Sequence, residues 1–164
     1  MAAFIYDEWF RVMGAGTSPD LGATTALKFG ALLVMTDTTA DDEKGKANVG
    51  AFTTLDECDS TSYTGAANDG RIDIGTGSSW SSIGSGLGYK HDSSVDLTYT
   101  SLTASTRGVQ AVVIVCNTTG TALGTSADAS LVPVYYLDGV AFTPNGFTVT
   151  ISFNSSGIAT YATA

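Results

Sequence analysis

Few residues in this chain have the chemistry for catalysis or metal binding, and they lie far apart. His91 is the only histidine among 164 residues, so a site that needs two imidazoles is excluded. Asp92 follows it directly, but a neighbouring pair in a predicted loop is weak evidence for a catalytic dyad. The sequence has no G-x-S-x-G nucleophile elbow and no Walker A motif. We therefore predict that the protein is not an enzyme and binds no cofactor.

Two acidic clusters offer oxygen ligands of the kind that calcium prefers. They are Asp37, Asp41 and Asp42 in one predicted loop and Asp56, Glu57 and Asp59 in another. Neither cluster has the ligand spacing of an EF-hand, so solvated loops are the favoured interpretation. A carboxylate pair for glycoside cleavage stays open, because the fold rather than the sequence spacing sets such a pair.

The cysteines and the N-terminal residues bear on the compartment. Cys58 and Cys116 allow one disulfide or none, and Cys116 ends an apolar segment, where a cysteine is usually a small buried hydrophobic residue. Residues 1–9 lack the basic region and the continuous apolar core of a signal peptide. No apolar run approaches the length of about 18 residues that spans a membrane. We expect a protein made in the cytoplasm, without a membrane segment.

The charge balance argues against nucleic acid as a partner. The formal net charge is −9, from 16 acidic and 7 basic residues. The basic residues are scattered along the chain, so they form no basic stripe that could follow a phosphate backbone. An acidic surface is typical of a soluble protein held at high local density, and simple solubility explains it equally well.

Strand patterns dominate the sequence. The segment 147–153 alternates strictly between apolar and hydroxyl residues, which predicts a strand whose apolar side chains, from Phe147 onward, share one buried face. The segment 109–116 is almost wholly apolar, which predicts a strand covered on both faces. These patterns predict an all-β fold, a single-domain antiparallel β-sandwich of jelly-roll or immunoglobulin-like type over residues 17–164.

The remaining segments complete this plan. Further strands are predicted at 29–35, 52–55, 71–74, 95–99, 131–137 and 158–161. Pro133 favours an edge position for its strand, because proline cannot donate a ladder hydrogen bond. The polar segment 36–48 reads as an exposed loop or short helical turn, and the Gly/Ser-rich segment 75–88 as a flexible loop.

Residues 1–16 are predicted to form an N-terminal helical arm. Apolar residues within 4–13 have the spacing of a short amphipathic helix, which Gly14 and Gly16 would end. The arm could cover one end of the sandwich or dock on a neighbouring subunit. In the docking interpretation, deletion of residues 1–13 weakens attachment and leaves the sandwich folded. The candidate partner contacts are Phe4, Trp9 and Phe10 in the arm and Trp80 and Ile83 in the loop 75–88.

Several segments of the C-terminal half occur in a recognisable order. They are DLTYT at 96–100, TRGVQAVVIV at 106–115, LVPVYYLD at 131–138 and FTPNGFTVTI at 142–151. In this order they resemble a family of small virion proteins of tailed bacteriophages, and the segment 59–65 is similar to a Tyr-Thr segment of that family. The similarity covers residues 29–161, with 75–88 as an added loop. The chain departs from the pattern at 115–117, where a tyrosine and an acidic residue would be usual.

The resemblance implies a virion structural protein. The implied role is a capsid decoration (cement) protein that binds the outer head surface and stabilises contacts between capsomers. Its partner would be the major capsid protein, its place the capsid exterior, and its state a homo-oligomer, trimer or dimer. The family carries over no catalytic residues. A neck, tail or fibre component stays open, as does a host-glycan-binding module with an aromatic face from Trp80, Tyr89 and Tyr99.

Overall fold

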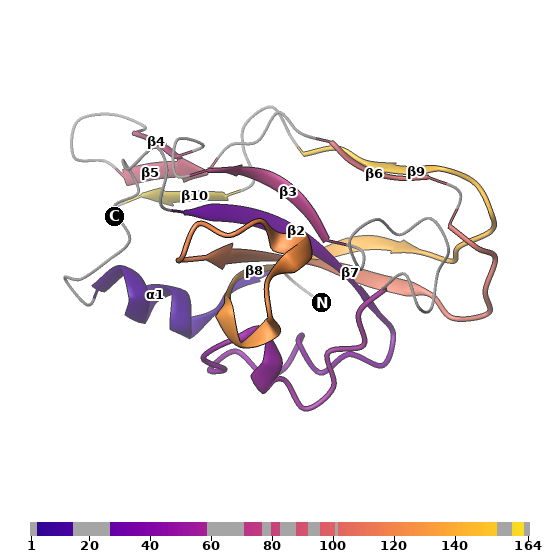
Figure 1. The fold of residues 1–164 in the computed structure, drawn as a ribbon, viewed down its shortest axis with the longest axis horizontal. Helices are drawn as coiled ribbons and strands as arrows, with labels where there is room; N and C mark the ends of the chain where they lie inside the picture. The colour runs from indigo at the N-terminus through magenta and orange to yellow at the C-terminus, as the bar shows by residue number, and fades with distance from the viewer. Residues whose placement is uncertain are drawn as a thin grey trace.

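Antiparallel strands are the main regular structure of this protein (Figure 1). The computed structural model describes residues 3–14, 27–58, 71–76, 80–82, 88–91, 96–100, 102–153 and 159–162. The strands are β1 (Phe4–Ile5), β2 (Lys28–Met35), β3 (Arg71–Thr76), β4 (Trp80–Ser82), β5 (Gly88–His91), β6 (Leu97–Tyr99), β7 (Val109–Asn117), β8 (Leu131–Phe142), β9 (Val149–Ile151) and β10 (Ala159–Ala162). The helices are α1 (Asp7–Gly14) and the short 3-10 turns η1 (Val49–Ala51), η4 (Leu123–Thr125) and η5 (Asp128–Ser130). The predicted all-β class is confirmed.

The largest sheet has five strands in the order β1-β8-β7-β2-β3. Two smaller sheets have the orders β10-β5-β4 and β6-β9, and every pairing among the described strands is antiparallel. The central strands β2 and β7 are buried along nearly their whole length. This is the arrangement that the continuous apolar sequence of 109–116 predicts, since a strand covered on both faces has no polar side.

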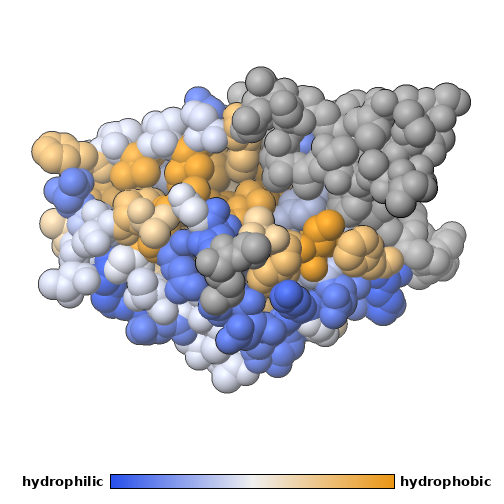
Figure 2. Space-filling model, turned by 180° about the vertical axis from the view of Figure 1, so that it is seen from behind, coloured by the Kyte–Doolittle hydropathy of each residue, from blue (hydrophilic) through white to orange (hydrophobic). Residues whose placement is uncertain are grey.

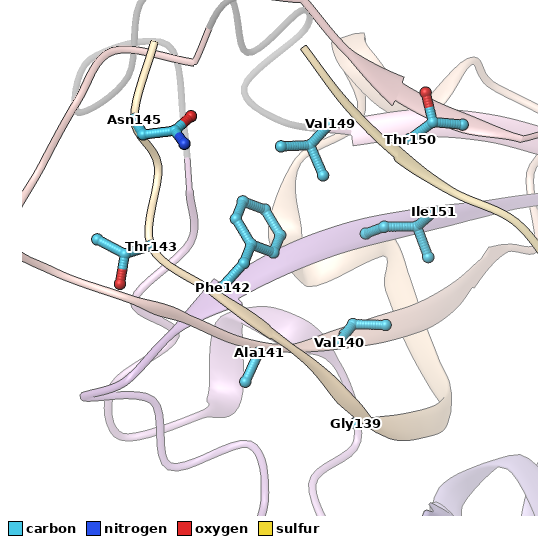
Figure 3. A pocket seen from close by; sticks show the side chains of 9 residues that line it. All are labelled: Gly139, Val140, Ala141, Phe142, Thr143, Asn145, Val149, Thr150 and Ile151. Carbon is cyan, nitrogen blue, oxygen red and sulfur yellow. The ribbon is translucent and has the colours of Figure 1, made fainter. Parts of the chain in front are cut away.

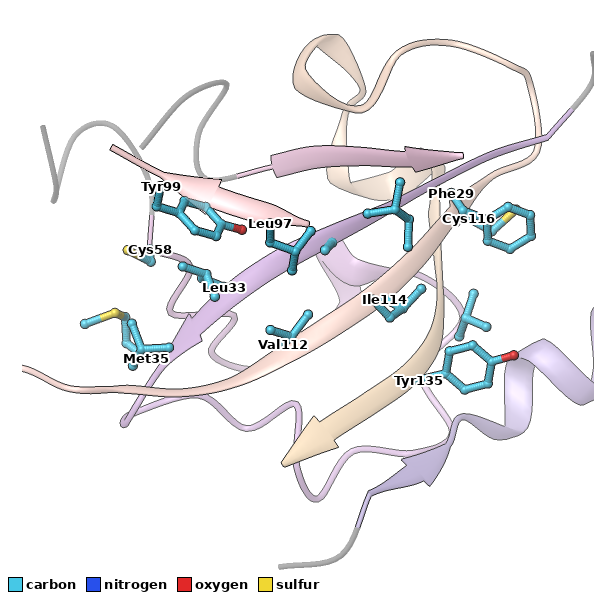
Figure 4. Packing of buried hydrophobic residues seen from close by; sticks show 14 of the residues in the cluster. Phe29, Leu33, Met35, Cys58, Leu97, Tyr99, Val112, Ile114, Cys116 and Tyr135 are labelled. Carbon is cyan, nitrogen blue, oxygen red and sulfur yellow. The ribbon is translucent and has the colours of Figure 1, made fainter. Parts of the chain in front are cut away.

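One face of the large sheet carries the first core. Its members include Phe29, Leu33 and Met35 of β2, Val112, Ile114 and Cys116 of β7, and Leu97 and Tyr99 of β6 (Figure 4). Val149 and Ile151 of β9 pack against the same cluster. The His91 ring of β5 lies 4.7 Å from the Phe29 ring, centroid to centroid. Residues of both smaller sheets therefore pack over this face.

The opposite face carries the second core. It is built from Leu32, Val34, Ala111, Val113 and Val115 on the sheet, together with Tyr6, Val49, Phe52, Leu123 and Tyr136. The Tyr6 hydroxyl donates a hydrogen bond of 2.7 Å to the carbonyl of Ala40, which attaches the segment 36–55 to the sheet. Burial raises the pKa of Tyr6, so the hydroxyl keeps its proton and remains a donor.

Gly30 of β2 lies where η4 and β3 leave no room for a side chain. A methyl group there would collide with the Leu123 side chain of η4 and lie 2.8 Å from the Ile72 carbonyl oxygen. We expect Gly30→Ala to lower the free energy of unfolding by about 1–3 kcal/mol, the usual cost of overpacking. Chemical denaturation measures the loss. Gly45→Ala is the matched control, because no atom lies within 4 Å of a methyl group at that position.

The loop 36–55 is organised around Glu43. Its carboxylate accepts hydrogen bonds from the Thr39 hydroxyl at 2.7 Å, the Thr53 amide at 2.7 Å and the Thr53 hydroxyl at 2.6 Å. The Lys46 ammonium lies 3.0 Å from the same carboxylate. These partners, the Thr39 hydroxyl first, lower the pKa of Glu43 to about 2.

The stability that Glu43 contributes therefore depends on pH. Because its pKa is lower in the folded protein, its ionised form stabilises the fold fully above the ordinary pKa of 4.5, and that contribution disappears as the pH falls towards 2. We expect Glu43→Gln to lower the melting temperature at neutral pH, with the difference from the wild type shrinking to nothing near pH 2. A difference that stays constant across the titration would contradict this role. Asp42→Asn, a change at an exposed position, is the control.

Several sequence expectations need correction. The predicted strand 52–55 is not a strand, because this segment covers the second core with irregular backbone after η1. The predicted loop 75–88 contains the end of β3 and all of β4, which pairs with β5. His91 lies in β5 and is fully buried rather than in a loop. The segment 36–48 is a loop of turns, as predicted, but it is only partly exposed, because Thr38 and Ala40 are buried.

The N-terminal segment is not a detached arm. Residues 4–5 form β1, so the helix begins at Asp7 rather than at residue 4. Tyr6 is fully buried in the second core and Trp9 in the first. The boundary predicted at residue 16 lies outside the described residues. Because the two cores enclose Tyr6 and Trp9, deletion of 1–13 is now expected to destabilise the fold, contrary to the docking interpretation.

Candidate partner-binding surface

A shallow groove of about 370 Å³, with both apolar and polar groups in its lining, opens between the end of β8 and β9 (Figure 3). It is lined by Gly139, Val140, Ala141, Phe142, Thr143, Asn145, Val149, Thr150 and Ile151. The side chains of Val140 and Phe142 point towards those of Val149 and Ile151 in Figure 3. All four are partly buried and pack against the first core. The groove is therefore the place where that core reaches the surface.

A bulge in β8 creates the groove. Val109 and Ala111 of β7 lie opposite Phe142 and Asp138, so residues 139–141 of β8 stand against one residue of β7. Gly139 has φ +93°, a left-handed conformation that glycine adopts without strain. Such a bulge bends the strand and redirects its side chains. Here it directs Val140 and Phe142 towards β9.

Phe147 stands exposed beside the groove, with 72% of its surface accessible. The turn before it is held in place, because the Gly146 amide donates to the Leu102 carbonyl at 2.8 Å and the Ser105 amide to the Pro144 carbonyl at 3.0 Å. The Asn145 side chain accepts a hydrogen bond from the Phe147 amide at 3.2 Å. A large apolar side chain presented by a tethered turn is a typical contact residue.

Both walls of the groove have an open strand edge. β9 pairs with β6, and among the described strands nothing pairs with its other side. β1 pairs with the outer side of β8 only at Tyr135 and Tyr136, so within the described ranges no strand covers residues 139–142 there. The edge position predicted from Pro133 is wrong for the strand 131–137, because β1 pairs with its outer side and the Tyr6 amide donates to the Val134 carbonyl. Open edges present backbone N–H and C=O groups that a further strand could bind.

The segments that form the groove carry no basic side chain. Residues 108–164 contain no lysine and no arginine. Asp138 precedes Gly139, and Asp96 precedes Leu97, which pairs with Ile151 of β9. Figure 2 shows hydrophobic residues gathered towards the left of the face it presents, the end that carries β6 and β9 in Figure 1. Asp138 does not line the groove: a hydrogen bond from the N-terminal ammonium and one from the Gly139 amide lower its pKa, and its charge acts on Tyr136 of the second core.

The five residues predicted as partner contacts differ in their burial and in their position in the fold. Trp9 is fully buried in the first core, so its prediction as a partner contact is wrong. Phe4 is half-buried, stacked on Tyr136 with ring centroids 5.2 Å apart. Phe10 is exposed. Trp80 lies in β4 opposite His91, and Ile83 lies outside the described residues. Phe4, Trp9 and Phe10 do not line the groove.

Sequence reasoning missed the groove because it read 147–153 as one strand. β9 begins only at Val149, and Phe147 belongs to the preceding turn rather than to the buried face. Val149, Ile151 and Phe153 pack against the first core as the alternation predicts. The available signal was the Asp138-Gly139 pair inside an apolar strand, since a glycine in such a run often marks a bulge.

The residues with reactive side chains are either buried in the cores or paired with other charges at the surface. Cys58 and Cys116 are both buried and form no disulfide with each other, and burial raises the pKa of Cys116 to about 12. Asp37 and Asp56 both bind Arg107. Within the described ranges no three histidine, cysteine or acidic residues group as metal ligands would, and Asp59 lies outside those ranges. No described helix has the length and apolar character needed to cross a membrane.

Comparison of the chain with protein-family models, with curated proteins and with solved structures finds no match. The resemblance to virion proteins of tailed phages therefore rests on the sequence segments alone.

Proposed function

We propose that this protein is a structural component of a tailed-phage virion, and in particular a capsid decoration protein on the outer head surface. The observation that carries the proposal is the groove between β8 and β9 together with Phe147, which stands exposed in the turn that leads into β9. Phe147 and six of the nine groove residues lie within 142–151, one of the segments that resemble the virion family. The chain uses these segments to form a surface for binding rather than only a core.

A decoration protein must be rigid and must add buried area across the seams between capsomers. The five-stranded sheet has a core on each face, and the two smaller sheets cover one of them. We infer from this that the domain is an open β-sandwich, whose unfilled edge is the groove. The major capsid protein is the proposed partner, and a closed trimer or dimer is the proposed oligomeric state.

The test is the copy number of this chain in purified particles, measured by quantitative mass spectrometry against the major capsid protein. A decoration protein repeats with the capsid lattice, so its copy number should be in simple ratio to that of the shell protein. We expect on the order of hundreds of copies per particle. A few copies per particle would instead make the chain a neck, tail or fibre component. Absence from particles would overturn the virion function and leave a host-glycan-binding module as the alternative, tested by binding to host surface glycan.

A further inference from the structure

We propose that β9 pairs with β9 of a second copy of this chain, in an antiparallel ladder whose two-fold axis lies at Thr150. The pairing would join the two β6–β9 sheets into one four-stranded sheet, in the order β6-β9-β9-β6, and so form a symmetric dimer. As the assembly state of a decoration protein, this dimer rests on the proposed function. The pairing itself rests on the sequence and structure of β9.

The outer edge of β9 has none of the features that protect strand edges from further pairing. Natural edge strands carry charged side chains, proline or a bulge. β3, an edge strand of the large sheet, carries Arg71 and Asp73, and β8 has its bulge at 139–141. The segment 147–153 contains no charge, no proline and no glycine, and β9 pairs with β6 without a shift of register. Among the described strands nothing pairs with its other side, so this edge can bind a further strand.

The sequence of β9 matches itself in the antiparallel direction. A two-fold axis at Thr150 sets Val149 of one copy opposite Ile151 of the other. Residues that lie opposite each other share a face, so apolar side chains meet apolar ones and the threonines meet each other. The pair β6–β9 already has this chemistry, since Leu97 lies opposite Ile151 and Thr98 opposite Thr150, with the two hydroxyl oxygens 3.5 Å apart.

The absence of charge around β9 selects a second copy as the partner. Each copy has a formal net charge of −9, so contact between acidic surfaces of two copies is repulsive. From Gly139 to Ala164, however, no residue has a charged side chain. Two copies that meet through β9 therefore do so at an uncharged surface. A charged partner segment would gain nothing there from opposite charge.

The pairing also accounts for the exposed Phe147. The same register brings Phe147 to the end of the ladder where Phe153 of the second copy lies. Because the axis repeats every contact, the interface would contain this aromatic pair twice. An apolar side chain that is 72% exposed beside an open strand edge is the kind of group that a dimer covers.

The oligomeric state of the purified protein tests the pairing. We expect sedimentation equilibrium to show a monomer–dimer equilibrium, because the axis uses the β9 edges of both copies and leaves none for a third. A protein that stays monomeric at the highest concentration measured would overturn the proposal. Open-ended assemblies would overturn it as well, since they require a contact that does not close.

Thr150→Lys tests the position of the axis. Thr150 is exposed, so the lysine leaves the core unchanged. In the dimer the two lysines would lie directly opposite each other, with Cβ atoms about 5 Å apart. We expect the dissociation constant of the dimer to rise about fivefold or more at about 0.1 M salt, the effect of like charges across a strand pair. An unchanged dissociation constant would contradict the assigned axis and overturn the proposal.

Thr98→Lys is the matched control. Thr98 is exposed on β6 directly opposite Thr150, so the lysine is added to the same strand pair. In the dimer its two copies lie three strand spacings apart, about 14 Å, which exceeds the screening length of about 10 Å at 0.1 M salt. Thr98→Lys should therefore dimerise as the wild type does. Equal weakening by the two variants would overturn the proposal.

A mixture of two charge variants separates the contact from a loss of folding. Thr150→Lys and Thr150→Glu should each dimerise weakly alone, because each places like charges at the axis. Their equimolar mixture should form a heterodimer at least as tightly as the wild type forms its homodimer, because lysine then faces glutamate. Misfolded variants would gain nothing on mixing. A mixture of folded variants that dimerises no better than either one alone would overturn the assigned register.

These measurements need no virus particles, which keeps the inference separate from the virion function. A monomeric protein found at high copy number in particles would overturn the β9 pairing alone. A protein that dimerises through β9 but is absent from particles would overturn the virion function alone.

Discussion

Trp9→Ala is expected to lower the free energy of unfolding by about 3–5 kcal/mol, the range for removing a large buried aromatic side chain. Trp9 is fully buried, and its ring lies 5.8 Å from the Phe29 ring, centroid to centroid. The helix α1 has only 8 residues, which is too short to be stable without tertiary packing. Loss of Trp9 should therefore release α1 from the first core. Urea denaturation followed by circular dichroism measures the change.

The adjacent residue is the matched control. Phe10 is 51% exposed, so Phe10→Ala should change the free energy of unfolding by about 0.5 kcal/mol or less. Two neighbouring aromatic residues of one helix would then differ several-fold in their effect. If both variants were as stable as the wild type, α1 would be a free arm, and the docking role inferred from the sequence would be restored.

Arg71→Met is the second change with a large expected effect. We expect it to lower the free energy of unfolding by about 3–5 kcal/mol. Arg71 is only 8% exposed, and it donates to both carboxylate oxygens of Glu57 at 2.9 and 2.8 Å. It also donates to the Ser126 carbonyl at 2.8 Å and binds Asp128. Its removal leaves the largely buried Glu57 carboxylate without this partner. The cost is the desolvation of that carboxylate rather than the strength of the ion pair.

A double variant separates these two causes. Arg71→Met combined with Glu57→Met removes both buried charges, and we expect it to recover most of the stability lost in Arg71→Met. Asp128→Asn should cost about 1 kcal/mol or less, because 43% of the Asp128 side chain is exposed and water screens the pair. A double variant that is no more stable than Arg71→Met would show that the loss comes from the ion pair itself rather than from the desolvation of Glu57. Thermal and urea unfolding at constant ionic strength provide the comparison.

The strands with the strongest local signals could be predicted from the sequence. The run 109–116 has no polar face, which predicts a strand covered on both sides. It lies within β7, the central strand of the large sheet. The run 29–35 likewise lies within β2. The segment 52–55 was predicted incorrectly because a few apolar residues fit a strand as well as an irregular cover. Its place over the second core depends on contacts with Tyr6, which is distant in the sequence.

The candidate site shows the same limit. The Thr-Pro-Asn-Gly turn at 143–146 was visible in the sequence, but the alternation that follows it does not say where the strand begins. Hydrogen bonds from the turn to Leu102 and Ser105 hold Phe147 outside the sheet. Residues 139–141 form a bulge only because β7 places a single residue opposite them. Both facts depend on partners far away in the sequence.

The amino-acid sequence by itself determined the all-β class, the identity of the longest strands and the amphipathic character of the first helix. It also placed Trp9 and Phe10 on a helix, where neighbouring side chains point in different directions. Only the tertiary structure decided that Trp9 enters the core while Phe10 and Phe147 remain exposed. The physical reason is that periodicity is a local property of the chain. Burial and strand register depend instead on which distant segments pack together.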